Sequence, residues 1–236
     1  MYPPTNFQYQ TLFLDAATHQ LRPQPSPEAQ SLSYDATVPW SYPPTSFQGF
    51  TYTFAKYTEL CGFSKATLYM STADHDDMDV YVMIRKLDAK GNPLQHFNIP
   101  FRDLPPDTAE ANIPHENVWR YIGPNGRLRA SHRAVRIEPD YEEEKRRLLS
   151  DAYVWHPHDR EEKLTPNEIV KLEIMLWPGG MVLAENESIR FDVLGHDPRM
   201  PEFEGLDKQF KMFNVGKHVL HTGGEYSSSL YVALSE

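Results

Sequence analysis

Apolar and polar residues alternate in several short stretches of this chain, the pattern of strands with one buried and one exposed face. In Phe50–Phe54, aromatic side chains take every second position between threonines. The pattern predicts strands at 11–14, 50–54, 66–70, 79–84, 127–137, 169–177, 188–194, 217–221 and 229–234. About nine or ten short strands separated by turns favour an all-β sandwich or barrel.

The predicted strand 127–137 is rich in polar and basic residues. Strand alternation would place Arg129, Ser131 and Arg133 on one face and His132 on the other. The charged stretch 141–149 that follows has helical composition, which predicts one short helix of about two or three turns.

Turn-forming residues mark the connections between these strands. Asp88–Pro93 is a strong turn signal directly after strand 79–84, so the two together predict a β-hairpin. Residues 99–126 are rich in turn formers and predict a long loop. Residues 1–45 contain eight of the twenty prolines, which predicts an extended arm packing on a domain formed by residues 46–236.

Composition and charge then restrict the class of protein. The chain has 236 residues, 40% of them hydrophobic, so it can fill a sizeable core. A net charge of −10 argues against nucleic acid or an anionic membrane as partner. One cysteine excludes a disulfide framework, and the first residues carry no secretory signal. We therefore expect a cytoplasmic protein.

Several segments resemble a known domain when they are taken in order. They are Leu128–Arg133, Leu164–Val170, Leu176–Pro178, Ser188–Val193 and His218–Leu230, with Asp76–Val82, Lys86–Asp88 and Gly91–Asn92 before them. Together they resemble the C-terminal domain of the X-Pro dipeptidyl-peptidase and cocaine esterase (CocE/NonD) serine hydrolases. The resemblance runs from about Thr11 to the end of the chain.

This resemblance implies a jelly-roll β-sandwich akin to galactose-binding folds. In the family, the sandwich lies beside an α/β-hydrolase domain that carries the catalytic triad, and it helps to wall the active site. The chain departs from the family pattern at two turns. Asn167 replaces a glycine between Pro166 and Glu168, and Asn186 is predicted to take the left-handed conformation in the turn 184–187.

The chain offers little machinery for nucleophilic catalysis. It contains no Gly-x-Ser-x-Gly pentapeptide, and Cys61 lies between the apolar residues Leu60 and Phe63, as inert buried thiols usually do. A histidine and a carboxylate could still act as acid and base. The candidates are His132 with Asp76 or Asp79, although aspartates at the end of a strand more often accept backbone N–H groups.

Arg129, Ser131 and Arg133 are candidate ligand-binding residues, because arginines bind anions and carboxylates through bidentate contacts. Ion pairing with the acidic surface is the structural alternative. Trp177 is a further candidate, although its place at the end of a strong strand favours a packed core edge.

His218 and His221 are the remaining binding candidates. Three residues apart on one strand, they should point to opposite faces and so cannot ligate one ion. The pair His156 and His158 has Pro157 between its members, where a metal-binding strand would need a backbone donor. We expect no metal site and no cofactor.

Three functions remain open at this stage. The first is a binding or accessory module for a small-molecule ligand or a separate α/β-hydrolase chain, and an apolar groove beside Leu128–Arg133 would support it. The second is a small-molecule isomerase, dehydratase or cyclase that uses a His/Asp pair in a pocket. The third is a carbohydrate-binding module, which rests on fold analogy alone. Any of them could form a homo-oligomer.

Overall fold

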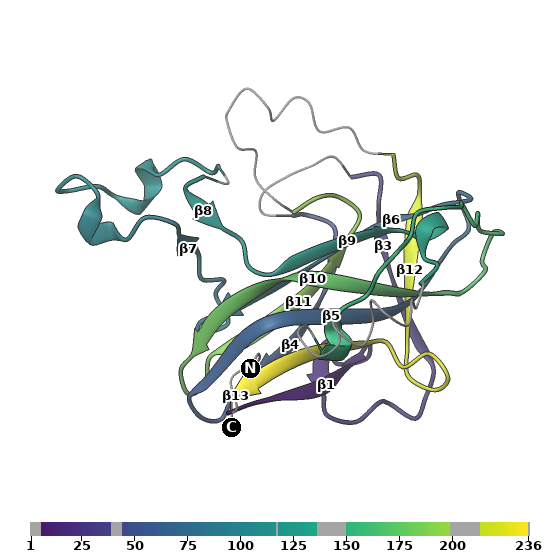
Figure 1. The fold of residues 1–236 in the computed structure, drawn as a ribbon, viewed down its shortest axis with the longest axis horizontal. Helices are drawn as coiled ribbons and strands as arrows, with labels where there is room; N and C mark the ends of the chain where they lie inside the picture. The colour runs from purple at the N-terminus through teal and green to yellow at the C-terminus, as the bar shows by residue number, and fades with distance from the viewer. Residues whose placement is uncertain (1–5, 39–43, 117, 136–149, 199–212, 236) are drawn as a thin grey trace.

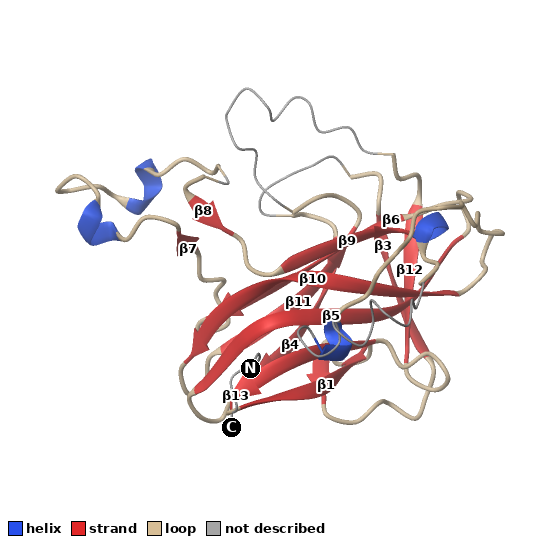
Figure 2. Cartoon of the chain, viewed as in Figure 1, coloured by secondary structure: helices blue, strands red, loops and turns tan. Residues whose placement is uncertain are grey.

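The computed structural model of the chain describes residues 6–38, 44–116, 118–135, 150–198 and 213–235. Strands dominate these ranges, and the helices within them are short 3₁₀ turns (Figure 2). The strands are β1 (Phe7–Asp15), β2 (Gln20–Arg22), β3 (Gln30–Asp35), β4 (Phe47–Thr53), β5 (Thr58–Thr72), β6 (Asp79–Leu87), β7 (His96–Phe97), β8 (Arg120–Tyr121), β9 (Asn125–Arg129), β10 (Val170–Leu183), β11 (Ser188–Leu194), β12 (Lys217–Thr222) and β13 (Ser229–Ser235). The 3₁₀ turns are η1 (Phe101–Asp103), η2 (Glu110–Asn112), η3 (Ala130–His132) and η4 (Ser150–Ala152).

These strands form a β-sandwich, which confirms the predicted all-β fold class. The hydrogen-bonded order is β3-β12-β5-β13-β1-β2-β4-β11-β6-β9, and β10 pairs with the other edge of β5 (Figure 1). The short strand β2 joins the two halves of this order, because it pairs antiparallel with β1 and parallel with β4. The strands β7 and β8 form a separate two-stranded sheet.

The core lies between the two halves of the sheet, and strand alternation fills it. Along β5, buried and partly exposed positions alternate from Thr58 to Met70. Its buried residues Leu60, Ala66, Leu68 and Met70 join Phe50, Leu172, Phe191 and Leu230 in one cluster. Burying a large apolar side chain contributes about 1.5–3 kcal/mol, so the alternation read from the sequence also places the residues that stabilise the core.

Most predicted strands lie inside observed strands. Residues 11–14 fall in β1, 66–70 in β5, 79–84 in β6 and 188–194 coincide with β11. The turn after β6 also forms, since Leu94 N–H donates to the Lys86 carbonyl and Asp88 accepts from Asn92. The two asparagines at family glycine positions, Asn167 and Asn186, both have a φ of 67°, so each takes the left-handed conformation.

The proline-rich segment 1–45 contributes three strands to the main sheet. In its described part, β1 pairs with β13 from Phe7 to Phe13, and β3 pairs with β12 along its whole length. This part of the segment is therefore hydrogen-bonded into the sheet rather than laid over a finished core. The boundary at residue 45 stays a prediction.

The predicted strand 127–137 was wrong for residues 130–135, and its last two residues lie outside those that the structure describes. The chain leaves the sheet at Arg129, and η3 follows at once, beginning where Ala130 N–H donates to the Met78 carbonyl. The predicted helix at 141–149 lies outside the described residues. None of the helices in the described ranges is long and apolar enough to cross a membrane.

Strands β9 and β10 approach each other closely at Gly126. A Cβ atom at this position would lie 2.3 Å from the backbone oxygen of Met175. Because that oxygen belongs to a strand in the core, it cannot move aside as a flexible side chain would.

We predict that Gly126→Ala lowers the free energy of unfolding by roughly 1–3 kcal/mol, the usual cost of overpacking. Gly180→Ala is the matched control, since Gly180 lies in the neighbouring strand β10 and nothing stands within 4 Å of its would-be Cβ. The control should stay within about 0.5 kcal/mol of the wild type. Urea unfolding measures both variants, and equal effects would contradict the tight approach.

Candidate functional site

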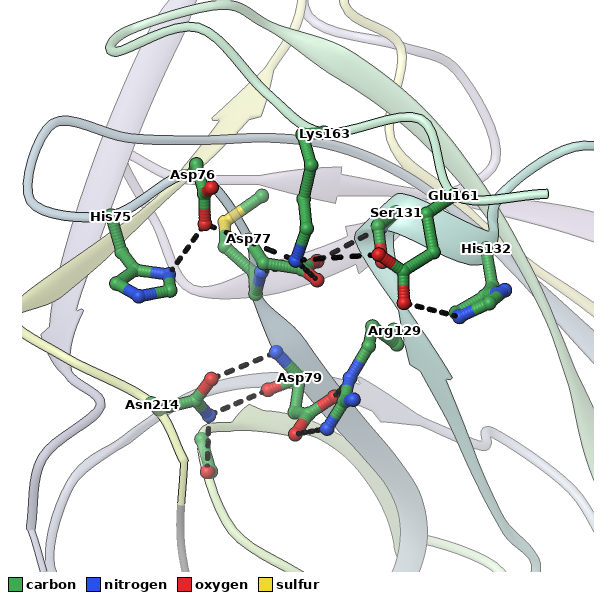
Figure 3. Close-up of polar contacts among 12 residues, drawn as sticks. His75, Asp76, Asp77, Asp79, Arg129, Ser131, His132, Glu161, Lys163 and Asn214 are labelled. Atoms are coloured by element: carbon green, nitrogen blue, oxygen red, sulfur yellow. Dashed lines mark hydrogen bonds and ion pairs between the residues drawn. The ribbon is translucent and has the colours of Figure 1, made fainter.

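Several of the predicted polar residues gather at one end of the sandwich, where β6 begins and β9 ends (Figure 3). Asp79 and Arg129 lie directly opposite each other in the β6–β9 register. The Arg129 guanidinium donates to both carboxylate oxygens of Asp79, with Nε–Oδ1 at 2.7 Å and Nη2–Oδ2 at 2.8 Å. These hydrogen bonds raise the pKa of Arg129, so its guanidinium stays charged in this bidentate ion pair.

Asn214 fixes the backbone beside this pair. Its side-chain oxygen accepts from the Asp79 N–H at 2.8 Å, and its amide nitrogen donates to the Asp79 carbonyl at 2.8 Å. The same nitrogen lies 2.6 Å from the Gly195 carbonyl. Asn214 therefore ties the start of β6 to the end of β11, as Figure 3 shows.

Asp77 joins three parts of the chain. Its carboxylate accepts from the backbone N–H of Ser131 at 2.9 Å, from that of Met78 at 2.9 Å and from Lys163 Nζ at 3.0 Å. Burial opposes ionisation of Asp77, but these hydrogen bonds outweigh it and hold the pKa of the carboxyl below its ordinary value. Asp77 was absent from the predicted site residues, although it lies in the acidic stretch 74–79 together with the candidates Asp76 and Asp79.

Asp76 stands on the outer side of the same turn. Its carboxylate lies 3.2 Å from His75 Nδ1 and 4.0 Å from Lys163 Nζ, and its backbone carbonyl accepts from Leu164 N–H. The acidic stretch thus anchors the segment around Lys163 by both side-chain and backbone contacts. This is the structural role that aspartates at a strand end usually play.

The expectation that Arg129, Ser131 and Arg133 share one strand face was wrong. The 3₁₀ turn η3 rotates the chain after Arg129, so Ser131 is fully buried and Arg133 turns back to donate to the carbonyls of Ala130 and Glu162. Arg129 alone of the three remains on the outer face, paired with Asp79. The guanidinium groups therefore do not converge on one anion.

His132 lies on η3, apart from the carboxylates proposed as its partners. Its Nε2 is 3.7 Å from Glu161 Oε1, and its ring centroid is 5.1 Å from that of His158. Burial, followed by the neighbouring His132 and His156, lowers the pKa of His158. The structure therefore pairs His132 with Glu161, while Asp79 is committed to Arg129 and Asp76 to His75 and Lys163.

Trp177 is exposed rather than packed at the edge of the core, with 69% of its surface accessible. The β5–β10 register breaks between Leu176 and Gly179, where Pro178 has no N–H to donate to the ladder. This bulge turns Trp177 outward, where it lines a small cavity of about 280 Å³ with Tyr81, His156 and the Arg127–Asp197 ion pair. A ligand role for Trp177 stays a prediction.

His218 and His221 lie on opposite faces of β12, as their spacing predicts. His218 is fully buried, and its Nδ1 is 3.0 Å from the hydroxyl of the buried Tyr34. His221 is partly exposed and lies 2.8 Å from Ser71 Oγ. Burial lowers the pKa of His218 to about 4, so the ring stays neutral in the core near pH 7.

A larger cavity lies elsewhere and was missed by sequence reasoning. It has a volume of about 890 Å³ and is mainly apolar. One wall comes from the segment 94–101 and from Tyr121–Gly123, and the other from β5 and β10 at Glu59–Cys61 and Gly180–Val182. Residues 99–126 read only as a loop in the sequence. Closely spaced aromatic residues at 97, 101 and 121 were the available signal.

A buried arginine organises the segment between β6 and β9, residues 88–124, which we call the excursion and which forms the first wall of the cavity. Arg120 is 3% exposed and donates to the backbone carbonyls of Glu110, Ile113 and Pro114 at 2.6–3.1 Å. It also donates to the Gln95 side chain and stacks over the Phe97 ring, with 4.9 Å from Cζ to the ring centroid. The segment between β6 and β9 is thus held together by its own contacts, away from the main core (Figure 1).

Comparisons with known proteins assign the class of this molecule. A CocE/NonD family hydrolase from Staphylococcus aureus superimposes with a TM-score of 0.74 at 30% sequence identity, covering 100% of this chain and 38% of that one. An aminopeptidase from the marine sediment archaeon Thaumarchaeota archaeon (14% identity, 100% and 38% coverage, TM-score 0.60) and an α-amino acid ester hydrolase (12% identity, 95% and 36% coverage, TM-score 0.53) share the fold. None of the curated proteins compared with the chain matches it significantly.

The molecule is thus a non-catalytic β-sandwich of the kind found in hydrolases. The family of the X-Pro dipeptidyl-peptidase C-terminal non-catalytic domain matches residues 1–231, and the chain belongs to that family. It spans 38% of the length of the two S. aureus hydrolase structures it matches. The predicted resemblance is confirmed.

We predict that His218 makes the fold sensitive to acid. Its folded pKa of about 4 lies below the ordinary value of 6.5, so the unfolded chain binds more protons between these pH values. The resulting stability is fully present above pH 6.5 and falls by about 3 kcal/mol as the pH drops toward 4. His218→Gln should flatten this part of the stability–pH curve in urea unfolding, whereas the exposed control His96→Gln should follow the wild type. Parallel curves for His218→Gln and wild type would contradict the prediction.

We also predict that Arg120 controls the order of the excursion but not of the sandwich. Arg120→Met leaves three carbonyls without their donor, so limited proteolysis between residues 99 and 119 should accelerate about tenfold or more, as about 1.4 kcal/mol of local stability is lost. Arg102→Met is the control, since this arginine of the same excursion is exposed. The melting temperature of the sandwich should change little in either variant. A global loss of stability in Arg120→Met would show that the excursion is part of the core.

Proposed function

We propose that the chain acts as an accessory β-sandwich that packs against an α/β-hydrolase catalytic domain and helps to shape its active-site surroundings. Membership of a non-catalytic domain family supports an accessory role in general. The partner is an inference from the relatives, in which more than half of the chain lies outside the part that this sandwich matches.

The observation that carries this proposal is the contrast between two surfaces. In the polar cluster of Figure 3, the charged groups of Asp77, Asp79, Arg129 and Lys163 are paired with one another. The apolar cavity, by contrast, is walled by an ordered excursion that adds little to the core of the sandwich. An ordered apolar surface outside the core is typical of a contact with another domain.

An apolar groove beside Leu128–Arg133 would have located this contact near the polar cluster. The described surface there is charged, with Arg129, Arg133, Glu161 and Glu162 in ion pairs. This counts against that location, and the accessory role depends instead on the cavity beside residues 94–101.

The contacts of His132 do not favour a free-standing acid–base enzyme, because its described carboxylate neighbour is the exposed Glu161. A carbohydrate-binding role still rests on analogy of the fold. We therefore advance neither as a second function.

A chimaeric hydrolase tests the accessory role. The matched C-terminal part of the S. aureus CocE/NonD family hydrolase is replaced by this chain, joined through a protease-cleavable linker. After cleavage we expect the two parts to elute together in size-exclusion chromatography, because the interface holds them. The S. aureus hydrolase with the same cleavable linker is the positive control.

Elution of the sandwich at its own monomer mass, while the control stays intact, would overturn the proposal. If the chimaera proves insoluble, the isolated chain is added in excess to the cleaved control, where it should displace the native sandwich. Failure to displace would then count equally against the proposal. The isolated chain should not hydrolyse aryl-ester or X-Pro amide reporters, and turnover abolished by a serine-directed inhibitor would contradict a non-catalytic role.

A further inference from the structure

The cavity beside residues 94–101 presents apolar side chains to solvent on both of its walls. Leu94 and Phe101 on the excursion are 43% and 44% exposed, and Val182 on β10 is 50% exposed. Phe97 and Met181 lie between them along the lining. We call this surface, lined by Leu94, Phe97, Phe101, Tyr121, Met181 and Val182, the apolar groove. Exposed apolar side chains gathered in one place mark interaction sites more often than scattered ones do.

The apolar groove is preorganised. Phe97 and Phe101 meet edge to face with centroids 5.0 Å apart, and the guanidinium of the buried Arg120 stacks over Phe97. On the opposite wall, β10 pairs with β5 in fixed register, with Gly180 opposite Cys61 and Val182 opposite Glu59. Since both walls are fixed before binding, a partner need not order them, which lowers the cost of association.

One carboxylate at the groove is left for a partner. Glu59 accepts a hydrogen bond from the Tyr57 hydroxyl at 2.7 Å, but it takes part in none of the ion pairs of the described residues. Lys86, the cation that also lines the groove, is paired with Glu187 at 2.7 Å. A basic group on the partner would therefore find Glu59 unpaired beside an apolar surface.

The groove is wide enough to take several side chains of a protein segment. Six separate parts of the chain line its volume of about 890 Å³: Phe7, Glu59–Cys61, Lys86, residues 94–101, Tyr121–Gly123 and Gly180–Val182. The sandwich matches 38% of the S. aureus hydrolase chain, so in that relative a larger part of the same chain is joined to the sandwich. The charged groups of Figure 3 already pair with one another, as in Arg129–Asp79 and Lys163–Asp77, so they leave fewer free charges for a partner to bind.

We propose that the hydrolase catalytic domain docks in the apolar groove through an apolar segment flanked by a basic residue that pairs with Glu59. This inference rests on the proposed accessory function and names the surface that performs it. The apolar segment fills the space between Phe101 and Val182, and the charge pair fixes its register.

The reactivity of Cys61 can report whether the apolar groove is occupied. Cys61 is the single cysteine of the sequence, is partly exposed and lines the groove. In the isolated chain it should react with a maleimide. In the chimaeric hydrolase its reaction should slow by about tenfold or more, as expected when about 1.4 kcal/mol or more of contact must open first. Peptide-level mass spectrometry assigns the labelled thiol in the presence of any cysteines of the relative.

A matched pair of substitutions tests the apolar contact. Val182→Asp places a charge in the groove, whereas Val215→Asp places the same charge at a valine of similar exposure, 46%, near the polar cluster. In the cleaved chimaera, Val182→Asp should weaken association by about 10- to 100-fold, because a charge would be buried without a partner. Val215→Asp should leave association unchanged. The melting temperatures of the isolated variants show that each still folds.

A second pair tests the charge. Glu59→Gln should weaken association by about three- to tenfold and make it less sensitive to salt, whereas the exposed control Glu28→Gln should change neither property. Association that does not respond to Glu59→Gln would overturn the basic-residue part of the proposal.

The outcomes separate the inference from the function on which it rests. If the cleaved chimaera stays together but Cys61 reacts as in the isolated chain, or Val215→Asp disrupts it instead of Val182→Asp, the catalytic domain docks elsewhere and the groove proposal is wrong. If the parts do not associate at all, the accessory function fails as well. If Cys61 is protected in the isolated chain at high concentration, a second copy of this chain occupies the groove, which also overturns the proposal.

Discussion

The sandwich depends on β5, because this one strand is hydrogen-bonded on both edges for almost its whole length. Strand β10 covers one edge from Thr58 to Met70, and the other edge passes from β13 to β12. At the change of partner, the buried Ser228 takes over the pairing: its hydroxyl accepts from Tyr69 N–H at 2.9 Å and donates to the His221 carbonyl at 2.7 Å. A single hydroxyl thus bridges the Tyr69 N–H of β5 and the His221 carbonyl of β12, which supplies the partners that buried polar groups require.

Much of this fold could be predicted from the sequence, because strand alternation is a local pattern. Segments such as 66–70 and 188–194 carry it, and the side chains that alternate are those that the core buries. The stretch 127–137 alternates equally well, but the chain leaves the sheet after Arg129. It does so because the Asp77 carboxylate accepts from the Ser131 N–H, which a neighbouring strand would otherwise have paired. Such a tertiary contact has no signature in the alternation. The prolines of residues 1–45 predicted an extended arm, whereas the strands β1, β2 and β3 form between these prolines.

The polar cluster shows why candidate residues were easier to find than their roles. Asp76, Asp79, Arg129, Ser131 and His132 do lie near one another, as the sequence order suggested. Their chemistry, however, is decided by partners that the sequence does not place beside them, such as Lys163, Glu161 and Asn214. Both oxygens of the Asp79 carboxylate already accept from Arg129, so this carboxylate is poorly placed to take a proton from a substrate. The same residue types can form a catalytic site or a structural joint, and only the neighbours distinguish them.

The length of β5 has one further consequence. Residues Glu59–Cys61 near the start of β5 line the apolar groove. Its last residue, Thr72, precedes the acidic stretch 74–79 of the polar cluster. Fifteen residues of strand, at about 3.3 Å each, separate the two features along the chain, several times the distance over which exposed charges act at physiological salt. Surface substitutions at one end are therefore nearly additive with those at the other. A change in the exposed surface of the groove therefore leaves the contacts that close the other end of the sandwich intact.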